Sequence, residues 1–368
     1  MLLKRLINRF KNSKLLSLFW RKNILLSDIC DVISHKGPDK KTAVLLFVHF
    51  WKREFIADYF PEYNLYYLSN RKYQKRTLRW LTKQDIVLIV WGYRDYQKHR
   101  DIFENCPNIL RVEDGFLRSV GLGKSRTTPL SLAIDSRGLY FDATRESDLE
   151  HILNHHEFRI TELDKAKKAI ALIKRHGISK YNHAPKRDMD SYFKPLKKSR
   201  VLVIGQVEND ASIKYGCSSG CTNNELVKLA WRENPACEII FKVHPDILSN
   251  KTSSQSLSEI SDICTIISDN IAPCSLFEMV DKVYTITSLM GFEALLFGLP
   301  VVCIGAPFYS NWGLTDDRQL VSRRHRKRTF EEVFCAAYIL YPHYPYGDIL
   351  TIIPRLGVSR TKASALID

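Results

Sequence analysis

The sequence predicts an α/β protein with two Rossmann-like domains that face a cleft, and three observations support this fold class. Its 368 residues suit two domains of ordinary size. Short apolar runs alternate with polar stretches of helical character, as in domains built around a mostly parallel sheet. This alternation occurs twice, on either side of a basic, proline-containing stretch at residues 180–199.

The first segment, residues 1–40, is predicted to be basic and amphipathic. Residues 1–26 contain seven Lys or Arg and no acidic residue, and their apolar side chains fall near one helical face. Such a helix can lie in the interface of an anionic membrane, and the alternative is a helix that packs on the protein itself. No apolar run approaches the ~20 residues that span a bilayer, and no signal-peptide cleavage site follows.

A first Rossmann-like domain is predicted at residues 41–179. Buried strands are expected at three apolar runs, 43–50, 86–91 and 109–112. The polar stretch 71–82 is predicted to be a helix between strands, and a long helical stretch at 148–175 closes the domain.

The linker at 180–199 leads to a second Rossmann-like domain at 200–330 and a helical tail at 331–368. Strands are expected at the apolar runs 201–204, 238–243, 282–286 and 300–304, and helices at 223–232 and 290–297. In open α/β sheets, ligands bind outside the carboxyl ends of the strands. The polar residues that follow each strand are therefore the candidates for function.

Charge and composition narrow the class of function. The formal net charge of +15 favours an anionic partner, such as nucleic acid, a phospholipid surface or an anionic substrate.

The nine cysteines show no pairing pattern, which suits a reducing cytosol. Cys217 and Cys221 lack a second pair at zinc-site spacing, so no metal site is expected. Neither a P-loop nor a dinucleotide-binding glycine motif is present, which argues against an ATPase or a nicotinamide dehydrogenase. The basic run 323–328 lacks interleaved aromatic residues, so it is predicted to be a solvated or membrane-facing patch.

Two adjacent carboxylates follow the third predicted strand. Glu113 and Asp114 precede Gly115 at the carboxyl end of this strand. Neighbouring carboxylates can split their pKa values, which leaves one of them able to exchange a proton near neutral pH. Arg118 would supply a cation for an anionic substrate. The alternative is a turn whose acidic residues cap the next helix.

Two further polar groups follow strands of the second half. Gln206 can hydrogen-bond a ligand, and Asp210 can act as a nucleophile or can cap a helix. Lys242 and His244 end the next strand, where they could neutralise and protonate a leaving phosphate, although His-Pro pairs also occur at ordinary strand ends.

The last polar group is Thr287 and Ser288, which end a strand just before a predicted helix. Hydroxyls and backbone N–H groups at a helix N-terminus form an anion site, and Glu293 could bind ribose hydroxyls one turn later; capping alone is the alternative. Carboxylates from the first half of the chain and a phosphate-binding site from the second half would suit a transferase that uses a sugar nucleotide.

Five stretches together resemble the capsule polysaccharide biosynthesis proteins of the KpsC/LipA type. They are VEDGFLRSVGLG (112–123), PLSLAIDSRGLYFDATRESDLE (129–150), GQVENDASI (205–213), KVHPD (242–246) and TSLMGFEALLFGLPVVCIGAPFYSNWGLT (287–315). Their order and spacing agree with the family, and the resemblance extends roughly from Val90 to Arg328.

The resemblance implies a GT-B-like fold and a β-Kdo glycosyltransferase that uses CMP-Kdo, retains the β configuration and needs no metal or other cofactor. Bacterial sialyltransferases carry comparable motifs for CMP-activated acids. On this chain the resemblance implies that Asp114 is the acid/base, supported by Glu113, and that Asp210 is the nucleophile of a double displacement. The implied donor-binding residues are Arg118, Gln206, Lys242, His244, Thr287, Ser288 and Glu293.

One departure from the family concerns copy number, because KpsC carries two such modules in tandem and this chain carries a single set of motifs. It would therefore make one linkage type, act with a partner transferase, or add a terminal Kdo. The expected partners are CMP-Kdo, a lipid-linked capsule or lipopolysaccharide glycan, assembly proteins and the anionic inner face of the cytoplasmic membrane, with no nucleic acid. The protein would then be cytoplasmic and peripheral to that membrane. The alternatives are a transferase for another CMP-activated acid, such as sialic acid, and a non-catalytic export scaffold.

Overall fold

The computed structural model describes Leu26 and residues 30–69, 74–120, 126–189, 192–193, 198–244, 246 and 257–364. The chain divides into two compact units, residues 1–109 and 110–368, and each is described by itself. Most of the predicted amphipathic segment, residues 1–25 and 27–29, lies outside the described residues. The predicted domain boundaries and the linker at 180–199 stay predictions.

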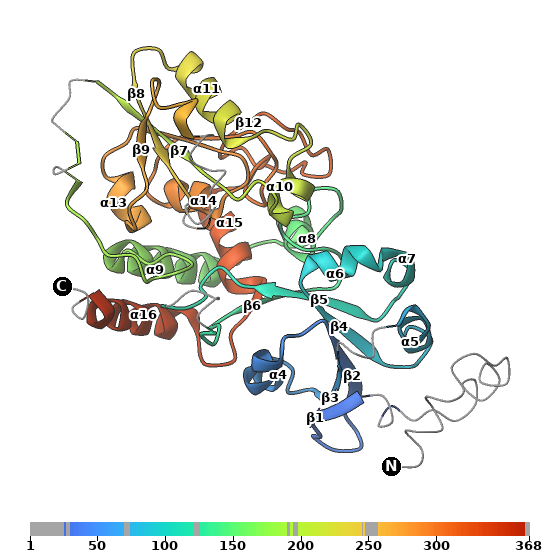
Figure 1. Ribbon diagram of the computed structural model, residues 1–368. Coiled ribbons are helices and arrows are strands. Elements are labelled where there is room, and N and C mark those ends of the chain that lie inside the picture. The colour runs from blue at the N-terminus through green and yellow to red at the C-terminus, as the bar shows by residue number, and fades with distance from the viewer. Residues whose placement is uncertain are drawn as a thin grey trace. The chain divides into compact units, whose positions relative to one another are not determined.

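The first unit contains four strands in the order β1-β3-β2-β4 (Figure 1). These are β1 (Cys30–Ser34), β2 (Lys41–Leu46), β3 (Tyr63–Leu68) and β4 (Val87–Trp91). The strand β2 pairs in parallel with both β3 and β4, whereas β1 is antiparallel to β3. The helical elements are η1 (Phe50–Lys52), α4 (Arg53–Tyr59), α5 (Lys75–Leu81), α6 (Tyr93–Lys98) and α7 (Arg100–Phe103).

The strand predicted at 43–50 is shorter than expected. It ends at Leu46 because Phe47 adopts a φ of 58°, a left-handed conformation that cannot continue a strand, and a 3₁₀ turn follows at η1. The strand predicted at 86–91 and the helix predicted within 71–82 are confirmed as β4 and α5.

The second unit contains a wholly parallel six-stranded sheet in the order β12-β11-β10-β7-β8-β9. Its strands are β7 (Arg200–Ile204), β8 (Glu238–Lys242), β9 (Thr265–Ile267), β10 (Lys282–Thr285), β11 (Val301–Cys303) and β12 (Asp316–Asp317). Helices α10 (Ala211–Gly216), α11 (Asn223–Glu233), α13 (Pro273–Phe277) and α14 (Leu289–Leu296) connect them.

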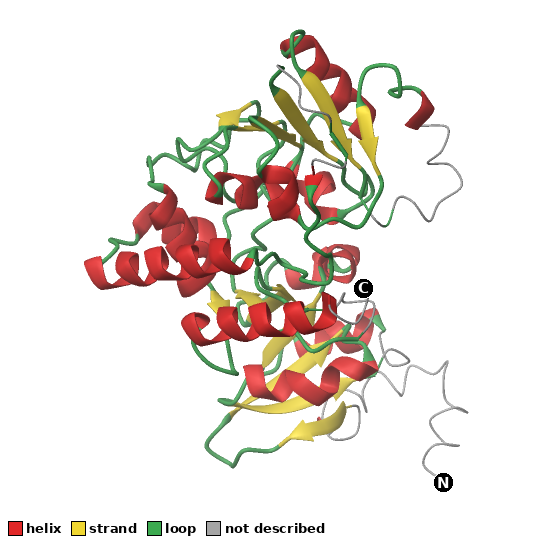
Figure 2. Ribbon diagram, turned by 90° about the vertical axis from the view of Figure 1, so that its left-hand side faces the viewer, coloured by secondary structure: helices red, strands yellow, loops and turns green. Residues whose placement is uncertain are grey.

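Helices cover both faces of this sheet (Figure 2), which explains why its strands read as continuous apolar runs. Along β7, Val201 and Val203 join the apolar cluster that contains residues of α11, whereas Leu202 and Ile204 join the cluster that contains Phe292 of α14. Successive side chains of a strand point to opposite faces, so each strand contributes to two cores. The mostly parallel sheet predicted for this half is confirmed.

A second set of strands in this unit is antiparallel. It consists of β5 (Ile109–Asp114), β6 (Leu132–Asp135) and β13 (Pro342–His343), with β6 between the other two. The helical elements beside them are α8 (Asp148–His155), α9 (Ile160–His176), α15 (Phe330–Cys335), η5 (Ala336–Leu340) and α16 (Ile349–Ser364). The long helix predicted at 148–175 is therefore two helices, separated at residues 156–159.

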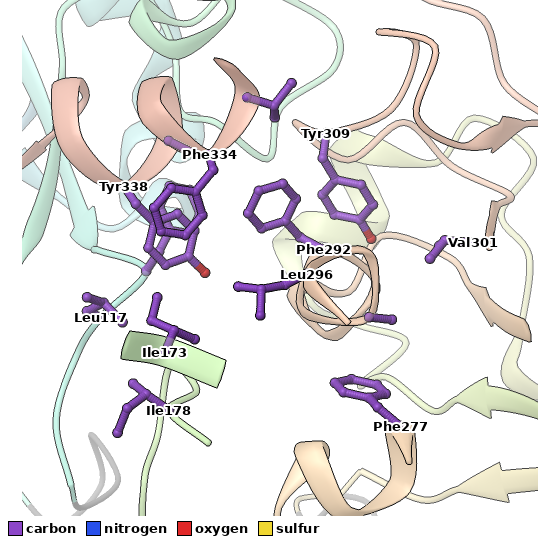
Figure 3. Close-up of a cluster of buried hydrophobic side chains, with 14 of the residues drawn as sticks. Leu117, Ile173, Ile178, Phe277, Phe292, Leu296, Val301, Tyr309, Phe334 and Tyr338 are labelled. Carbon is purple, nitrogen blue, oxygen red and sulfur yellow. The ribbon is translucent and has the colours of Figure 1, made fainter. Parts of the chain in front are cut away.

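The core of this unit is centred on stacked aromatic rings (Figure 3). Phe292 of α14 lies 5.6 Å from Tyr309 and 5.7 Å from Tyr338 between ring centroids, and Phe334 stacks on Tyr338 at 4.6 Å. Because Phe334 and Tyr338 come from residues 330–340, the helices near the C-terminus complete a core that α14 begins.

The basic run 323–328 is only in part the solvated patch that its composition predicts, because His325 and Lys327 are exposed whereas Arg324 and Arg328 are buried. The side chains of Arg324 and Arg328 are only 2% and 3% exposed. Glu150 of α8 accepts hydrogen bonds from both Arg323 and Arg324, and Arg328 donates to the carbonyl of Leu153 at the end of α8. The run therefore ties a loop of the second unit to helix α8.

Within the described part of the chain, none of the helices combines the length and the apolar character that crossing a bilayer requires.

We expect the substitution Glu150→Ala to destabilise the second unit strongly. The glutamate is buried and its removal leaves the Arg324 guanidinium buried without its carboxylate, which costs about 3–5 kcal/mol. Urea unfolding should therefore show a lowered midpoint. The matched control is Glu157→Ala, which breaks an exposed ion pair with Arg326 and should leave the midpoint almost unchanged. Equal effects of the two substitutions would contradict this account.

Candidate active site

Asp114 is the last residue of β5, and its position is set by the pairing of that strand. Glu113 and Asp114 lie opposite Ala133 and Leu132 of β6. Directly after the strand, the N–H of Gly115 donates to the carbonyl of Ser131. A Cβ atom at Gly115 would lie 2.3 Å from the hydroxyl oxygen of Ser131, so only glycine permits this close approach.

An ion pair with the buried Arg118 holds the Asp114 carboxylate, which is itself half-buried. The Nε of Arg118 donates to Asp114 Oδ2 at 2.7 Å, and the side chain of Arg118 is 1% exposed. The other carboxylate oxygen, Oδ1, is buried and has no hydrogen-bond partner among the residues that the structure describes. One oxygen of Asp114 is therefore fixed by an arginine, and the hydrogen-bonding capacity of the other, buried oxygen is unused among the described residues.

Residues 179–182 cross directly beside this ion pair. The N–H groups of Arg118 and Ser119 both donate to the carbonyl of Lys180, and Asn182 donates back to the carbonyls of Ser119 and Val120. The sequence places Lys180 at the start of a linker and does not identify it as a site residue. Only its position in a basic stretch pointed to it, and that signal is too common to select one lysine.

Lys180 adds a cation to the surroundings of Asp114. Its Nζ lies 3.5 Å from the hydroxyl of Tyr140, and both Lys180 Nζ and the Arg118 guanidinium lie 5.8 Å from the ring centre of Tyr181. Burial lowers the pKa of Lys180, but the oxygens of Tyr140 and Tyr181 and the Asp114 carboxylate outweigh burial, so the net pKa is raised. Burial also raises the pKa of Tyr140 to about 12. Both groups stay protonated at neutral pH.

Gln206 links two loops at the carboxyl edge of the parallel sheet. Its side chain accepts from the N–H of Thr287 at 2.8 Å and donates to the Thr287 hydroxyl at 3.1 Å. Asn223 binds the backbone N–H and carbonyl of Gln206. Both Gln206 and Thr287 are buried, so these contacts set the shape of the edge.

Asp210 and Ser288 both cap helices. Asp210 Oδ1 accepts from the N–H of Ser212 at the start of α10, and Asp210 is exposed to solvent. Ser288 Oγ accepts from the N–H of Met290 at the start of α14. Capping, the alternative that the sequence left open, is therefore observed at both positions; it does not test the catalytic or donor-binding roles.

Lys242 ends strand β8, and His244 follows it at the same edge of the sheet. Lys242 is buried and its Nζ donates to the carbonyls of Val243 and Asp269, and burial lowers its pKa. His244 Nδ1 accepts from the N–H of Asp246 at 3.2 Å. Since Nδ1 acts as an acceptor, the neutral imidazole carries its proton on Nε2.

Glu293 lies in the interior and faces residue 180. It is 7% exposed, and its Oε1 accepts from the N–H of Lys180 at 3.1 Å. Burial raises its pKa to about 7. In this structure the carboxylate therefore fixes the backbone of the segment that passes Asp114, and its predicted contact with ribose stays a prediction.

The structure thus brings seven of the ten predicted residues into two groups within the second unit. Glu113, Asp114 and Arg118 form one with Lys180 and Tyr140; Gln206, Asp210, Thr287 and Ser288 lie around the starts of α10 and α14. Gly216 lies between Thr287 and Phe141, the neighbour of Tyr140 in the sequence, since an added Cβ would lie 3.0 Å from the Thr287 side chain and 3.1 Å from the carbonyl of Phe141.

Comparison with known proteins places this arrangement in a family. The family described as "Capsule polysaccharide biosynthesis protein" matches residues 85–199 and 190–344. The chain belongs to this family. It is 42% identical over 320 residues to the lipopolysaccharide-processing protein LpsZ of Rhizobium meliloti, a match that covers 84% of this chain and 72% of LpsZ.

A second relative is longer than this chain. The capsule polysaccharide modification protein LipA of Neisseria meningitidis serogroup A is 37% identical over 297 residues, which cover 76% of this chain and 42% of LipA. The chain thus matches less than half of the length of LipA.

Two solved structures resemble the chain along almost their whole length. The β-Kdo 2,4 transferase of Thermosulfurimonas dismutans KpsC has a TM-score of 0.75 at 35% identity, covering 86% of this chain and 98% of that chain. The β-Kdo 2,7 transferase of the same KpsC has a TM-score of 0.70 at 33% identity, covering 87% and 100%. The predicted α/β fold of the GT-B-like type is confirmed.

We expect Glu293→Gln to change how stability depends on pH. A carboxyl group whose pKa is raised to about 7 in the folded protein, from an ordinary value of 4.5, contributes stability below pH 4.5 that is lost as the pH rises to 7. The amide keeps the acceptor for the Lys180 N–H and does not titrate. Between pH 4.5 and 7 the wild type should lose up to about 3 kcal/mol relative to the variant, measured by urea unfolding. Parallel stability profiles for the two proteins would contradict the raised pKa.

Proposed function

We propose that this protein is a β-Kdo transferase that moves Kdo from CMP-Kdo to a lipid-linked glycan in capsule or lipopolysaccharide biosynthesis, with retention of configuration. The observation that carries the proposal is the resemblance to a β-Kdo 2,4 transferase over 98% of that chain at 35% identity. The Asp114–Arg118 ion pair supplies a reactive group that suits this chemistry.

The donor carries two anionic groups, a phosphate and a sugar carboxylate. Lys242 and His244 are proposed to contact the phosphate. Lys242 uses two of its three ammonium protons on backbone carbonyls, and the neutral His244 imidazole carries its proton on Nε2, the kind of donor that a phosphate oxygen requires. Thr287, Ser288 and the start of α14 would bind the remaining phosphate oxygens.

Retention requires either a covalent intermediate or attack on the same face of the sugar, and the geometry favours Asp114 as the nucleophile of a covalent route. Asp114 is fixed by Arg118, whereas the predicted nucleophile Asp210 is exposed and caps α10. A carboxylate oxygen of Asp114 would form a bond with the anomeric carbon while the bond from that carbon to the phosphate oxygen breaks and CMP leaves with the electron pair.

The second step completes the transfer. The acceptor hydroxyl attacks the anomeric carbon, the bond to Asp114 breaks, and the hydroxyl proton passes to a carboxylate. The proposed base is Glu113, which is next to Asp114 in the sequence, and the alternative base is Asp210. This order exchanges the roles that the sequence motifs imply for Asp114 and Asp210.

We expect Asp114→Asn to lower transfer at least about 10³-fold, because the amide is a poor nucleophile. Asp210→Asn is the comparison, since its side-chain oxygen can still cap α10. The measurements are transfer from CMP-Kdo and the intact mass of the protein after incubation with CMP-Kdo without acceptor. A Kdo adduct on Asp210, or full activity of Asp114→Asn, would overturn the assignment. CMP-sialic acid in the same assay tests the alternative donor, and no transfer from either donor would favour a scaffold.

Lys180 is proposed to recognise the sugar carboxylate. In Kdo this carboxylate is attached to the anomeric carbon, so a nucleophilic carboxylate that attacks this carbon meets a second negative charge. A protonated amine within electrostatic reach of Asp114 offsets that repulsion. Lys180, held by the backbone contacts of residues 118–119 and by Glu293, meets this requirement.

We expect Lys180→Met to raise the KM for CMP-Kdo about 10–100-fold, the effect of losing one hydrogen bond between charged groups. The affinity for CMP alone should not change, because CMP lacks the sugar carboxylate. Lys180→Arg should recover part of the loss. An equal loss of affinity for CMP and CMP-Kdo would show that Lys180 acts on the nucleotide or on the fold instead.

The remaining parts of the proposal concern the surroundings of the enzyme. We propose that residues 1–40 bring it to the anionic inner face of the cytoplasmic membrane, where the lipid-linked acceptor and other assembly proteins would be found. The seven Lys or Arg residues of 1–26, with no acidic residue among them, support such a location.

A further inference from the structure

We propose that Glu146, His151 and His155 form a binding site for a zinc ion on the surface of the second unit. Glu146 precedes helix α8, and the two histidines lie four residues apart on that helix. Residues at this spacing share one face of a helix, which directs both imidazoles to the same point. This inference does not depend on the transfer reaction.

One of the distances between ligand atoms already fits a tetrahedral ion. The three ligand atoms lie within 4.8 Å of one another, and His151 Nδ1 lies 3.3 Å from Glu146 Oε1. Two atoms that each lie ~2.0–2.1 Å from a tetrahedral zinc ion are ~3.3 Å apart, so this pair already has the required separation. The ring centres of His151 and His155 are 4.3 Å apart, and His155 is exposed to solvent.

Hydrogen bonds outside the triad orient its members as they do in metal sites. His155 Nδ1 lies 3.0 Å from the carbonyl of His151, so Nδ1 carries the proton and Nε2 is left as the ligand atom. Arg137 donates to Glu146 Oε2, which leaves Oε1 directed at His151. Ser147 caps α8 and thereby fixes the junction between Glu146 and the helix.

The donor set decides the class of ion. Two imidazoles and one carboxylate are the ligands of open zinc sites, whereas magnesium and calcium prefer oxygen ligands alone. Three protein ligands leave a fourth position for water or for a group from another molecule. An ion at this site would join the loop that carries Glu146 to helix α8, whose Glu150 holds Arg323 and Arg324.

The test uses the full chain after treatment with a chelator. Titration with Zn²⁺, followed by calorimetry and by the mass of the intact complex, should show one ion per chain that His151→Ala and His155→Ala each weaken at least about tenfold. Zn²⁺ should raise the melting temperature of the wild type, because it binds the folded state, and Mg²⁺ should not.

The matched control is His325→Ala, which removes an exposed histidine outside the triad and should leave zinc affinity unchanged. Melting without metal shows that each variant is folded. Absence of zinc binding by the wild type would overturn the proposal. Unchanged zinc affinity in both His151→Ala and His155→Ala would also overturn it, because the ion would then be held elsewhere, for example by cysteines.

Discussion

The arrangement of the candidate site depends on the burial of the Arg118 guanidinium. A charged group that is 1% exposed has lost its water and needs fixed partners, or the folded state loses several kcal/mol. Asp114 Oδ2 and the Ser119 hydroxyl supply those partners. Because both residues must stay close to Arg118, the end of β5, residues 118–120 and residues 179–182 are held together in one place. The same contact that stabilises the unit therefore orients the carboxylate.

Buried polar side chains extend this order to the parallel sheet. Gln206 joins the loop after β7 to the loop after β10, and Glu293 of α14 binds the backbone at Lys180. Each of these side chains is buried and makes a hydrogen bond to a backbone N–H of another segment. Loops at strand ends are usually the most mobile parts of an α/β fold. Here hydrogen bonds from Gln206 and Glu293 hold such loops to neighbouring segments.

The arginine-rich run at 323–328 shows the same principle outside the site. Its composition matches that of a membrane or nucleic-acid patch, yet Glu150 and the carbonyls at the end of α8 take up its guanidinium groups. A positive net charge therefore does not show how much cationic surface is available to bind a partner, because internal ion pairs neutralise part of the charge. His151 and His155, which also lie on α8, are by contrast partly exposed and exposed to solvent.

Local patterns in the sequence were sufficient to predict the parallel strands of residues 200–304 and the position of Asp114. The strands were predictable because burial on both faces of a sheet produces apolar runs. Asp114 was predictable because the ends of strands place polar residues at one edge. The shortened strand at 41–46 and the break between α8 and α9 were missed, since they depend on the φ angle of Phe47 and on caps near Arg159. Lys180, the inward direction of Glu293, the burial of Arg324 and the grouping of Glu146 with His151 and His155 followed only from tertiary structure. Each of these depends on a partner from a separate element or turn, and no local periodicity encodes which side chains a folded chain brings together.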